Sequence, residues 1–188
     1  MSNFNASYIQ NAAPLTASQK FSLAFRSAID PYAFLLAGVD AGISQATNAF
    51  PGYGQGAQGY AKRYGASYVD SFDGTILGNA LFPALFHEDP RYFRKGSGSF
   101  DNRFFYAMAT TVRAKSDKGK WVPNYGNILG NFAAGGISNL YYPSTDRGFG
   151  LTLQRAISVT AEGALGATLI EFWPDISRKL HHKKIAAK

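Results

Sequence analysis

Pairs of small residues four positions apart recur in each stretch of this chain that is expected to form a long helix. This spacing places both members on one helix face, where the missing side chains let a second helix approach closely. Two pairs sit in a shared longer pattern, G-x-I-L-G-N. The residues are Gly38 and Gly42, Gly74 and Gly78, Gly126 and Gly130, and Gly163 with Ala167. Chance would scatter such pairs, so we predict helices packed through glycine and alanine faces.

The rest of the chain also favours helices over strands. Thr16 can cap a first helix, and Asp30 followed by Pro31 is typical of the start of a second. No stretch sustains the alternation of polar and apolar residues that indicates a strand. Pro83 should kink a long helix, because it removes a backbone donor and clashes with the carbonyl of Asn79. Helices are expected near residues 16–29, 31–48, 60–86, 101–114, 126–142 and 148–172.

These signals predict an all-α fold, a bundle of about five to six helices. A length of 188 residues fits a single domain with a real core. The polar residues 1–15 are expected to form a flexible arm, residues 16–177 the helical domain, and residues 178–188 a basic tail.

The composition points toward a membrane or toward self-association. Only 16% of the residues are charged, against about 25% in an average domain. Aromatic residues make up 15%, and there are 20 glycines. No run of 18 apolar residues is present, so no standard spanning helix is predicted, and residues 1–5 show no signal peptide. A glycine-rich soluble domain is the alternative.

The positive charge lies in the second half of the chain. Residues 1–90 carry a net charge of −2, whereas residues 91–188 carry +9. Such asymmetry suggests a surface that meets the phosphates of lipid or of nucleic acid. Nucleic acid is the less favoured partner, because the cations are scattered and no known nucleic-acid-binding motif is present. The candidate phosphate or headgroup ligands are Arg91, Arg94, Lys95, Arg178 and Lys179, the first three beside a Gly-Ser loop at residues 96–99 with exposed N–H groups.

Aromatic residues recur beside prolines and charges where the helices are expected to end. Such rings suit a membrane interface, where they lie at headgroup level while the neighbouring cations meet phosphate. The alternative is ordinary helix termination, with the rings in the core and the charges in Arg–Asp pairs. The candidate interface aromatics are Tyr92, Phe93, Tyr141, Tyr142, Phe172 and Trp173.

No catalytic, metal or cofactor signature is recognisable. Consecutive residues on a helix diverge by about 100°, so His87, Glu88 and Asp89 do not converge on one ion. The chain has no cysteine, no H-E-x-x-H and no G-x-S-x-G. We therefore predict no catalytic residue, no metal and no cofactor. A soluble helical enzyme or ligand-binding domain with its site around His87–Lys95 is kept as an alternative.

Several longer boxes carry a family resemblance. They are P-L-T-A-S-Q-K-F, G-Y-G-Q-G-A-Q-G-Y-A-K-R-Y-G, F-P-A-L-F-H-E-D-P-R-Y-F-R-K-G, I-S-N-L-Y-Y-P and E-F-W-P-D-I. On these boxes, over about residues 14–180, the chain resembles an uncharacterised family of bacterial hypothetical proteins whose members usually look exported to the cell envelope. The resemblance implies an envelope location, and it brings no activity or catalytic residue with it.

Together, the residues and the resemblance favour a non-enzymatic, membrane-associated helical protein of the bacterial cell envelope with a structural or assembly role. Its expected partners are an anionic lipid or membrane surface and further copies of itself. The soluble enzyme or ligand-binding domain comes second, and a basic nucleic-acid-associated protein comes third.

Overall fold

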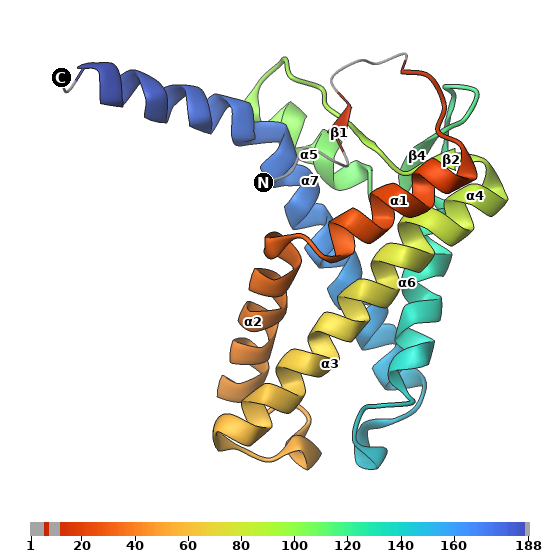
Figure 1. Ribbon diagram of the computed structural model, residues 1–188, viewed down its shortest axis with the longest axis vertical. Coiled ribbons are helices and arrows are strands. Elements are labelled where there is room, and N and C mark those ends of the chain that lie inside the picture. The colour runs from red at the N-terminus through yellow and green to blue at the C-terminus, as the bar shows by residue number, and fades with distance from the viewer. Residues whose placement is uncertain (1–5, 8–11, 187–188) are drawn as a thin grey trace.

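The computed structural model describes residues 6–7 and 12–186, with side chains as far as residue 178. The fold is all-α, as predicted, and helix makes up 71% of it (Figure 1). The helices are α1 (Ala17–Ala28), α2 (Pro31–Ala46), α3 (Gly56–Ile76), α4 (Phe82–Phe86), α5 (Phe100–Ala109), α6 (Tyr125–Ser138) and α7 (Phe149–Ala186). These seven helical segments form a bundle of about six helices, because the short α4 continues α3. A π-helical turn, η2 (Leu77–Leu81), joins α3 to α4, and short 3₁₀ turns lie at η1 (Pro51–Tyr53) and η3 (Ser144–Asp146).

The two predicted helix starts are confirmed. The hydroxyl of Thr16 accepts a hydrogen bond from the backbone N–H of Gln19 at 3.3 Å, and the side chain of Gln19 accepts one from the N–H of Thr16 at 2.9 Å. Asp30 caps α2 by accepting from the N–H of Tyr32 at 2.9 Å, with Pro31 in the first helical position. These bonds satisfy N–H groups that have no partner inside the helix.

The long third helix meets its proline through a widened turn. The N–H of Phe82 donates to the carbonyl of Leu77, five residues back, so α3, η2 and α4 continue as one helical rod. A regular turn would set the ring of Pro83 against the carbonyl of Asn79. The π turn ends at Leu81, two residues before Pro83, and it includes Asn79, whose carbonyl would clash with the ring.

The two G-x-I-L-G-N copies meet at this turn. A Cβ atom built on Gly130 of α6 would lie 2.5 Å from the Cα of Gly78 in η2. One built on Gly126 would lie 2.7 Å from the ring of Pro83, and one on Gly74 would lie 2.5 Å from the side chain of Val159 in α7. The contacts are closer than any side chain allows, so Gly130 lets α6 touch η2 backbone to backbone, while Gly126 and Gly74 leave room for the ring of Pro83 and the side chain of Val159.

The remaining small-residue positions behave differently. A Cβ at Gly38 would make ordinary contacts of 3.6 Å with Tyr60 and Tyr64. No atom lies within 4 Å of a Cβ at Gly42 or at Gly163. The expectation that Gly42 and Gly163 pack against a neighbouring helix therefore does not hold, because each faces open space.

Two small sheets lie at one end of the bundle and were not predicted. Strands β2, β4 and β5 pair antiparallel in that order, and β1 pairs parallel with β3. With two to four residues each, they are too short to show an alternating pattern. The strands are β1 (Ala6–Ser7), β2 (Glu88–Asp89), β3 (Tyr92–Phe93), β4 (Arg113–Ser116) and β5 (Trp121–Pro123). Within the predicted flexible arm, β1 is thus ordered, while residues 1–5 and 8–11 lie outside the described residues.

The last helix is longer than predicted. Helix α7 passes through Pro174 and ends at Ala186, so the predicted basic tail continues the helix over residues 178–186. Its C-terminal part projects away from the bundle (Figure 1). A proline leaves helix carbonyls in the preceding turn without donors. Arg94 and Arg103 donate to one of these, the carbonyl of Glu171, at 2.9 and 2.7 Å, and so stabilise the helix through Pro174.

Candidate functional site

The interior of the bundle is unusually polar. Its buried hydrophobic residues are mostly alanines, such as Ala24, Ala37, Ala80 and Ala134, each 0% exposed. The largest side chains that are less than 2% exposed are Arg155, Lys20, Glu88, Glu171, Asp70, Pro83, Ser67 and Ser138. Charged side chains are rarely buried unless they are paired, so the partners of these groups decide what the interior does.

Asp70 is the centre of one buried cluster. Its carboxylate accepts from Arg155 Nε, from the hydroxyl of Tyr141 and from the hydroxyl of Tyr142, each at 2.6 Å. Arg155 also pairs with Asp40 at 3.2 Å. The sequence placed Tyr141 and Tyr142 at a membrane interface. The structure turns both hydroxyls inward, and Tyr142 is only 2% exposed.

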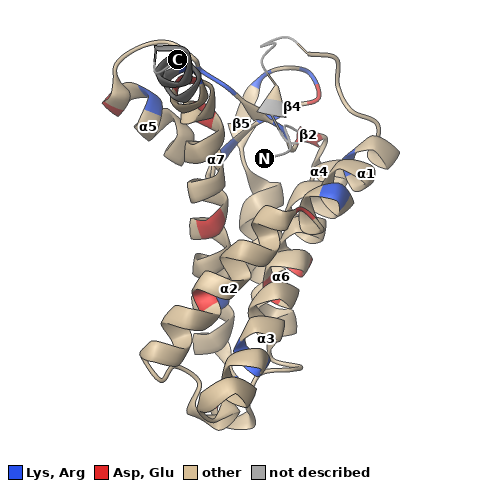
Figure 2. Cartoon of the chain, turned by 60° about the vertical axis from the view of Figure 1, so that its left-hand side comes forward, with Lys and Arg blue, Asp and Glu red and all other residues tan. Residues whose placement is uncertain are grey.

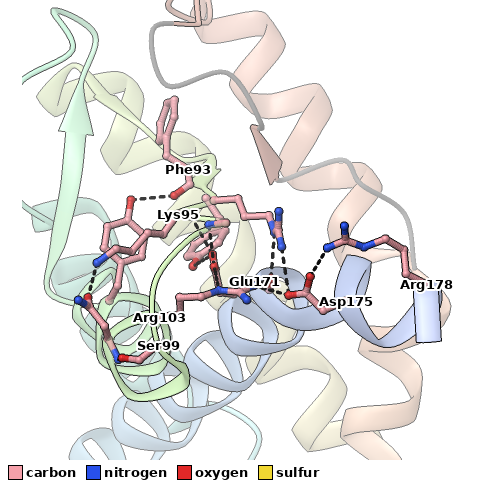
Figure 3. A network of polar contacts seen from close by, with 12 residues as sticks. Phe93, Lys95, Ser99, Arg103, Glu171, Asp175 and Arg178 are labelled. Atoms are coloured by element: carbon pink, nitrogen blue, oxygen red, sulfur yellow. Dashed lines mark hydrogen bonds and ion pairs between the residues drawn. The ribbon is translucent and has the colours of Figure 1, made fainter. Parts of the chain in front are cut away.

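Glu171 of α7 is the centre of a second cluster, at the end of the bundle that carries the sheets (Figure 3). Its carboxylate accepts from Arg103 Nε and the hydroxyl of Tyr92, both at 2.7 Å, and from the N–H groups of Lys95 and Gly96, both at 2.9 Å. The N–H of Gly96 in the Gly-Ser loop expected to bind phosphate, together with that of Lys95 directly before it, is therefore already directed at an anion. That anion is a side chain of the same protein.

The cations expected to meet headgroups are also engaged internally. Arg94 pairs with Asp175 at 3.3 Å, and Arg91 binds Asp89 through two nitrogens. The ammonium of Lys95 donates to Asn102. Arg178 contacts Asp175, yet its side chain is 71% exposed. The side chain of Lys179 lies outside the described residues, so only Arg178 of this group is shown with an open side chain.

The predicted interface aromatics at this end are mostly internal too. Tyr92 and Phe93 are 8% and 4% exposed. Phe172 is half-buried, stacks on Phe100 with ring centroids 4.9 Å apart, and lies under the guanidinium of Arg103. Trp173 is 40% exposed. The alternative of core rings and Arg–Asp pairs thus describes Tyr92, Phe93 and their neighbours, and Trp173 is the one exposed ring among the six candidate aromatics.

His87 is separated from the carboxylates next to it. It adopts a left-handed backbone conformation at the end of α4, with φ of 56°, and its side chain is 83% exposed. Glu88 turns inward and accepts from the N–H groups of Tyr125 and Gly126, at 3.0 and 2.8 Å, where α6 begins. Glu88 is therefore the anion at a helix N-terminus, a stabilising position that the sequence did not indicate.

The Glu171 cluster makes stability depend on pH. Burial raises the pKa of Glu171, but hydrogen bonds from Arg103, Tyr92, Gly96 and Lys95 outweigh burial and hold that pKa below its ordinary value of 4.5. A carboxyl whose pKa is depressed by folding contributes stability above its unfolded pKa, and this stability is lost as the pH falls through the folded pKa.

We therefore expect the free energy of unfolding to decrease as the pH is lowered from 5 toward 3. Glu171→Gln should flatten that decrease, since glutamine does not titrate. Burial raises the pKa of Glu88, and this works in the opposite direction, so the measurement is the difference between wild type and variant in urea titrations. Parallel pH profiles for the two proteins would contradict this role of Glu171.

The outer faces of the helices carry large apolar side chains instead of charges. On α2, α3, η2, α4, α6 and residues 149–170 of α7, all within the described part of the chain, Lys62 is the one exposed charged residue. We call the large apolar residues that are exposed on these elements the apolar surface. They are Phe34, Leu35, Val39, Ile43, Tyr60, Val69, Leu81, Leu85, Phe86, Tyr125, Ile128, Leu129, Phe132, Ile137, Phe149, Leu153, Ile157 and Leu165.

The charged residues are concentrated away from the apolar surface, at the end of the bundle that carries the sheets and α5. Figure 2 shows most blue and red residues at the end with β4, β5 and α5, and long uncharged stretches on the helices below. The sequence signal for this pattern was the low charge content together with runs such as α6, which has no charged residue. No helix among the described residues is both long and apolar enough to cross a bilayer.

A cavity of about 280 Å³ lies between α2, α3, α7 and the three-stranded sheet. Glu88, Asp89, Arg91, Tyr92 and Phe93 line it, so part of the stretch proposed as a ligand site does reach a cavity, whereas His87 does not. Comparison of the chain with models of protein families, with curated proteins and with solved structures gives no match.

Proposed function

We propose that this is a non-enzymatic, membrane-associated helical protein whose apolar surface lies against lipid acyl chains. The observation that carries the proposal is the reversed polarity of the bundle. Charged and polar groups fill its interior, whereas α2, α3, η2, α4, α6 and residues 149–170 of α7 present eighteen large apolar residues and, within this described part of the chain, Lys62 as their one exposed charge. The surface of a small soluble domain has about 25–35% charged residues, with both signs interspersed.

The paired interior supports the same proposal. Lipid offers no hydrogen bonds, so polar groups in contact with it must find partners inside the protein. Asp70 accepts four internal hydrogen bonds, from Arg155, Tyr141, Tyr142 and Ser138. Such a cluster leaves the outer helix faces free to be apolar, because the charges that the fold contains are neutralised within it.

Lipid is a better occupant for this surface than a second copy of the chain. Exposed apolar residues occur on α2, α3, α6 and α7, which lie around the bundle rather than on one side of it (Figure 1). A two-fold dimer interface covers one patch on each copy. Acyl chains cover all sides at once. Self-association, which the sequence also predicted, would then use part of this surface.

The charged end suits the headgroup region. Trp121, at the start of β5, is 43% exposed, and Lys118 and Lys120 in the turn before it are exposed too. On α7, Trp173 is 40% exposed, and Arg178 is exposed beside Asp175 (Figure 3). Tryptophan rings favour the membrane interface, and cations there attract anionic headgroups by about 1 kcal/mol each. The envelope location and the anionic lipid partner belong to this proposal.

Substitution of the apolar surface tests it. Leu35 is 64% exposed on α2. In water, Leu35→Lys would be nearly neutral for stability, but among acyl chains a lysine in place of leucine costs about 3 kcal/mol. We expect Leu35→Lys to lower flotation with phosphatidylcholine vesicles more than tenfold. Phe105→Lys, at a site 67% exposed on α5, is the matched control and should change flotation little.

Two results would contradict the proposal. Complete release of the protein from cell membranes by carbonate without detergent, together with no flotation, would show that acyl chains do not cover the apolar surface. A defined oligomer that does not float, and that Leu35→Lys dissociates, would show that further copies cover it instead.

Adding anionic lipid to the vesicles should strengthen binding if the charged end meets headgroups.

A further inference from the structure

Two residues that line the cavity beside the sheets each have a buried polar atom without a hydrogen-bond partner. Among the buried side-chain nitrogen and oxygen atoms of the described residues, two lack a hydrogen-bond partner: the hydroxyl oxygen of Tyr32 and Nε of Arg113. Both residues line the cavity of about 280 Å³. Buried polar groups are nearly always paired, and unpaired ones require an explanation. A bound ligand supplies one.

Arg113 also lacks a charge partner. No carboxylate of the described residues forms an ion pair with it, whereas Arg91, the other arginine at the cavity, is held by Asp89. The guanidinium of Arg113 lies 4.9 Å from the ring centroid of Trp121 and 5.3 Å from that of Tyr106. The two rings hold the guanidinium in place by cation–π contacts. They offer no hydrogen-bond acceptor to Nε, which remains an unpaired donor.

The chemistry of the lining limits the ligand. Arginine is a donor only, so Nε requires an acceptor, and the strongest acceptor for it is an anion. Four acidic residues, Asp30, Glu88, Asp89 and Glu162, also line the cavity. Each carboxylate already accepts hydrogen bonds within the protein: Asp30 and Glu88 from backbone N–H groups, Asp89 from Arg91 and Glu162 from Ser71. They oppose a multiply charged anion such as a phosphate ester, so the ligand is expected to carry a single negative charge, which Arg113 would meet.

The rest of the cavity suits an apolar body. Gly163, Gly166, Ala167 and Ile170 of α7 form one wall, with Val159 beside them. Gly163, which does not serve helix packing, leaves space there instead. At about 30 Å³ for each non-hydrogen atom of liquid water, the volume holds a molecule on the order of ten non-hydrogen atoms.

We infer that the cavity binds a small amphipathic monocarboxylate, with its carboxylate on Arg113 and its apolar body along the small-residue wall of α7. Tyr32 supplies a second polar contact on the α2 side. This assignment rests on the cavity and its two unpaired atoms, and it is independent of what covers the apolar surface.

Octanoate is a suitable probe, because it has one carboxylate and the right size. Isothermal titration of the purified full chain should show saturable binding of one octanoate. Octylamine and octanol have the same chain and no negative charge, so they should bind at least tenfold more weakly. These measurements need only the wild-type protein. Equal binding of all three probes, or no saturable binding of octanoate, would overturn the inference.

Variants then locate the site. Arg113→Gln should weaken octanoate binding at least tenfold, and Arg113→Lys should keep the preference for the acid over the amine. Tyr32→Phe should weaken binding less than Arg113→Gln. Lys118→Gln removes an exposed cation near the same strand and should leave binding unchanged. If Lys118→Gln weakens octanoate binding as much as Arg113→Gln does, binding depends on general charge attraction and not on the cavity. That result would contradict the inference.

Discussion

Gly130→Ala is expected to lower the free energy of unfolding by about 2–3 kcal/mol, the upper range for inserting a group into a packed interior. The added Cβ would lie 2.5 Å from the Cα and 2.6 Å from the backbone nitrogen of Gly78. Backbone atoms cannot rotate away as a side chain can. The two helices must therefore separate, and the contacts between the G-x-I-L-G-N copies are lost along with the close approach.

Gly136→Ala is the matched control for this change. Gly136 lies on the same helix, α6, and a Cβ there would meet no atom within 4 Å. Alanine is the better helix former by about 0.8–1.0 kcal/mol, so Gly136→Ala should stabilise the protein slightly. Urea titration of both variants separates helix propensity from packing. If the two variants are equally stable, the close crossing of η2 and α6 does not determine stability.

The close crossing shows how far the sequence could predict this fold. A spacing of four between glycines is a local signal, and caps such as Thr16 and Asp30 are local as well. They define helices and mark faces suited to close packing. They do not identify which face meets which helix, so Gly42 and Gly163 carried the same signal as Gly130 and yet face open space.

The sequence did not predict that the large apolar side chains of the helices face outward and the small ones inward. On α1, Ala24 and Ala28 are 0% and 1% exposed, while Phe21 and Phe25 of the same apolar stripe, and Ile29 directly after the helix, are 41–53% exposed. Small residues permit close helix contacts, so they turn inward, and the large ones remain outside. A hydrophobic pattern alone does not distinguish this arrangement from an ordinary core, because both place apolar residues on one stripe.

The polar clusters depend on residues far apart in the chain. Glu171 joins Tyr92 and Arg103, which are 79 and 68 positions away. The spacing of residues along the sequence does not indicate contacts between such distant positions. Without the contact to Glu171, the cations near the Gly-Ser loop suggested binding of an external phosphate. The pairing of β1 with β3 and the continuation of α7 through Pro174 were missed for the same reason, since long-range contacts stabilise them. The hairpin of β4 and β5 is local, and it was missed because its strands are too short to show an alternating pattern.

Breaking the Asp70 cluster should have the largest effect of all. Arg155 pairs with Asp70 at 2.6 Å and with Asp40 at 3.2 Å, and its own side chain is 2% exposed. Removing one partner of a buried ion pair leaves an uncompensated charge and costs about 3–5 kcal/mol. We expect Arg155→Met to lower the free energy of unfolding by that amount. Lys62→Met removes the exposed charge of α3 and should change it by less than about 0.5 kcal/mol.

The double variant Arg155→Met with Asp70→Asn separates charge from packing. Asparagine keeps one oxygen, which can accept from Tyr141 and Ser138 as Oδ1 of Asp70 does, and its amide N–H₂ can donate to the hydroxyl oxygen of Tyr142, but it carries no charge that needs Arg155. The double variant should therefore recover much of the stability that Arg155→Met loses, and the two changes should be non-additive in a double-mutant cycle. Additive losses would show that Arg155 stabilises the bundle by packing alone. In that case the buried charges would not be what allows the outer helix faces to be apolar.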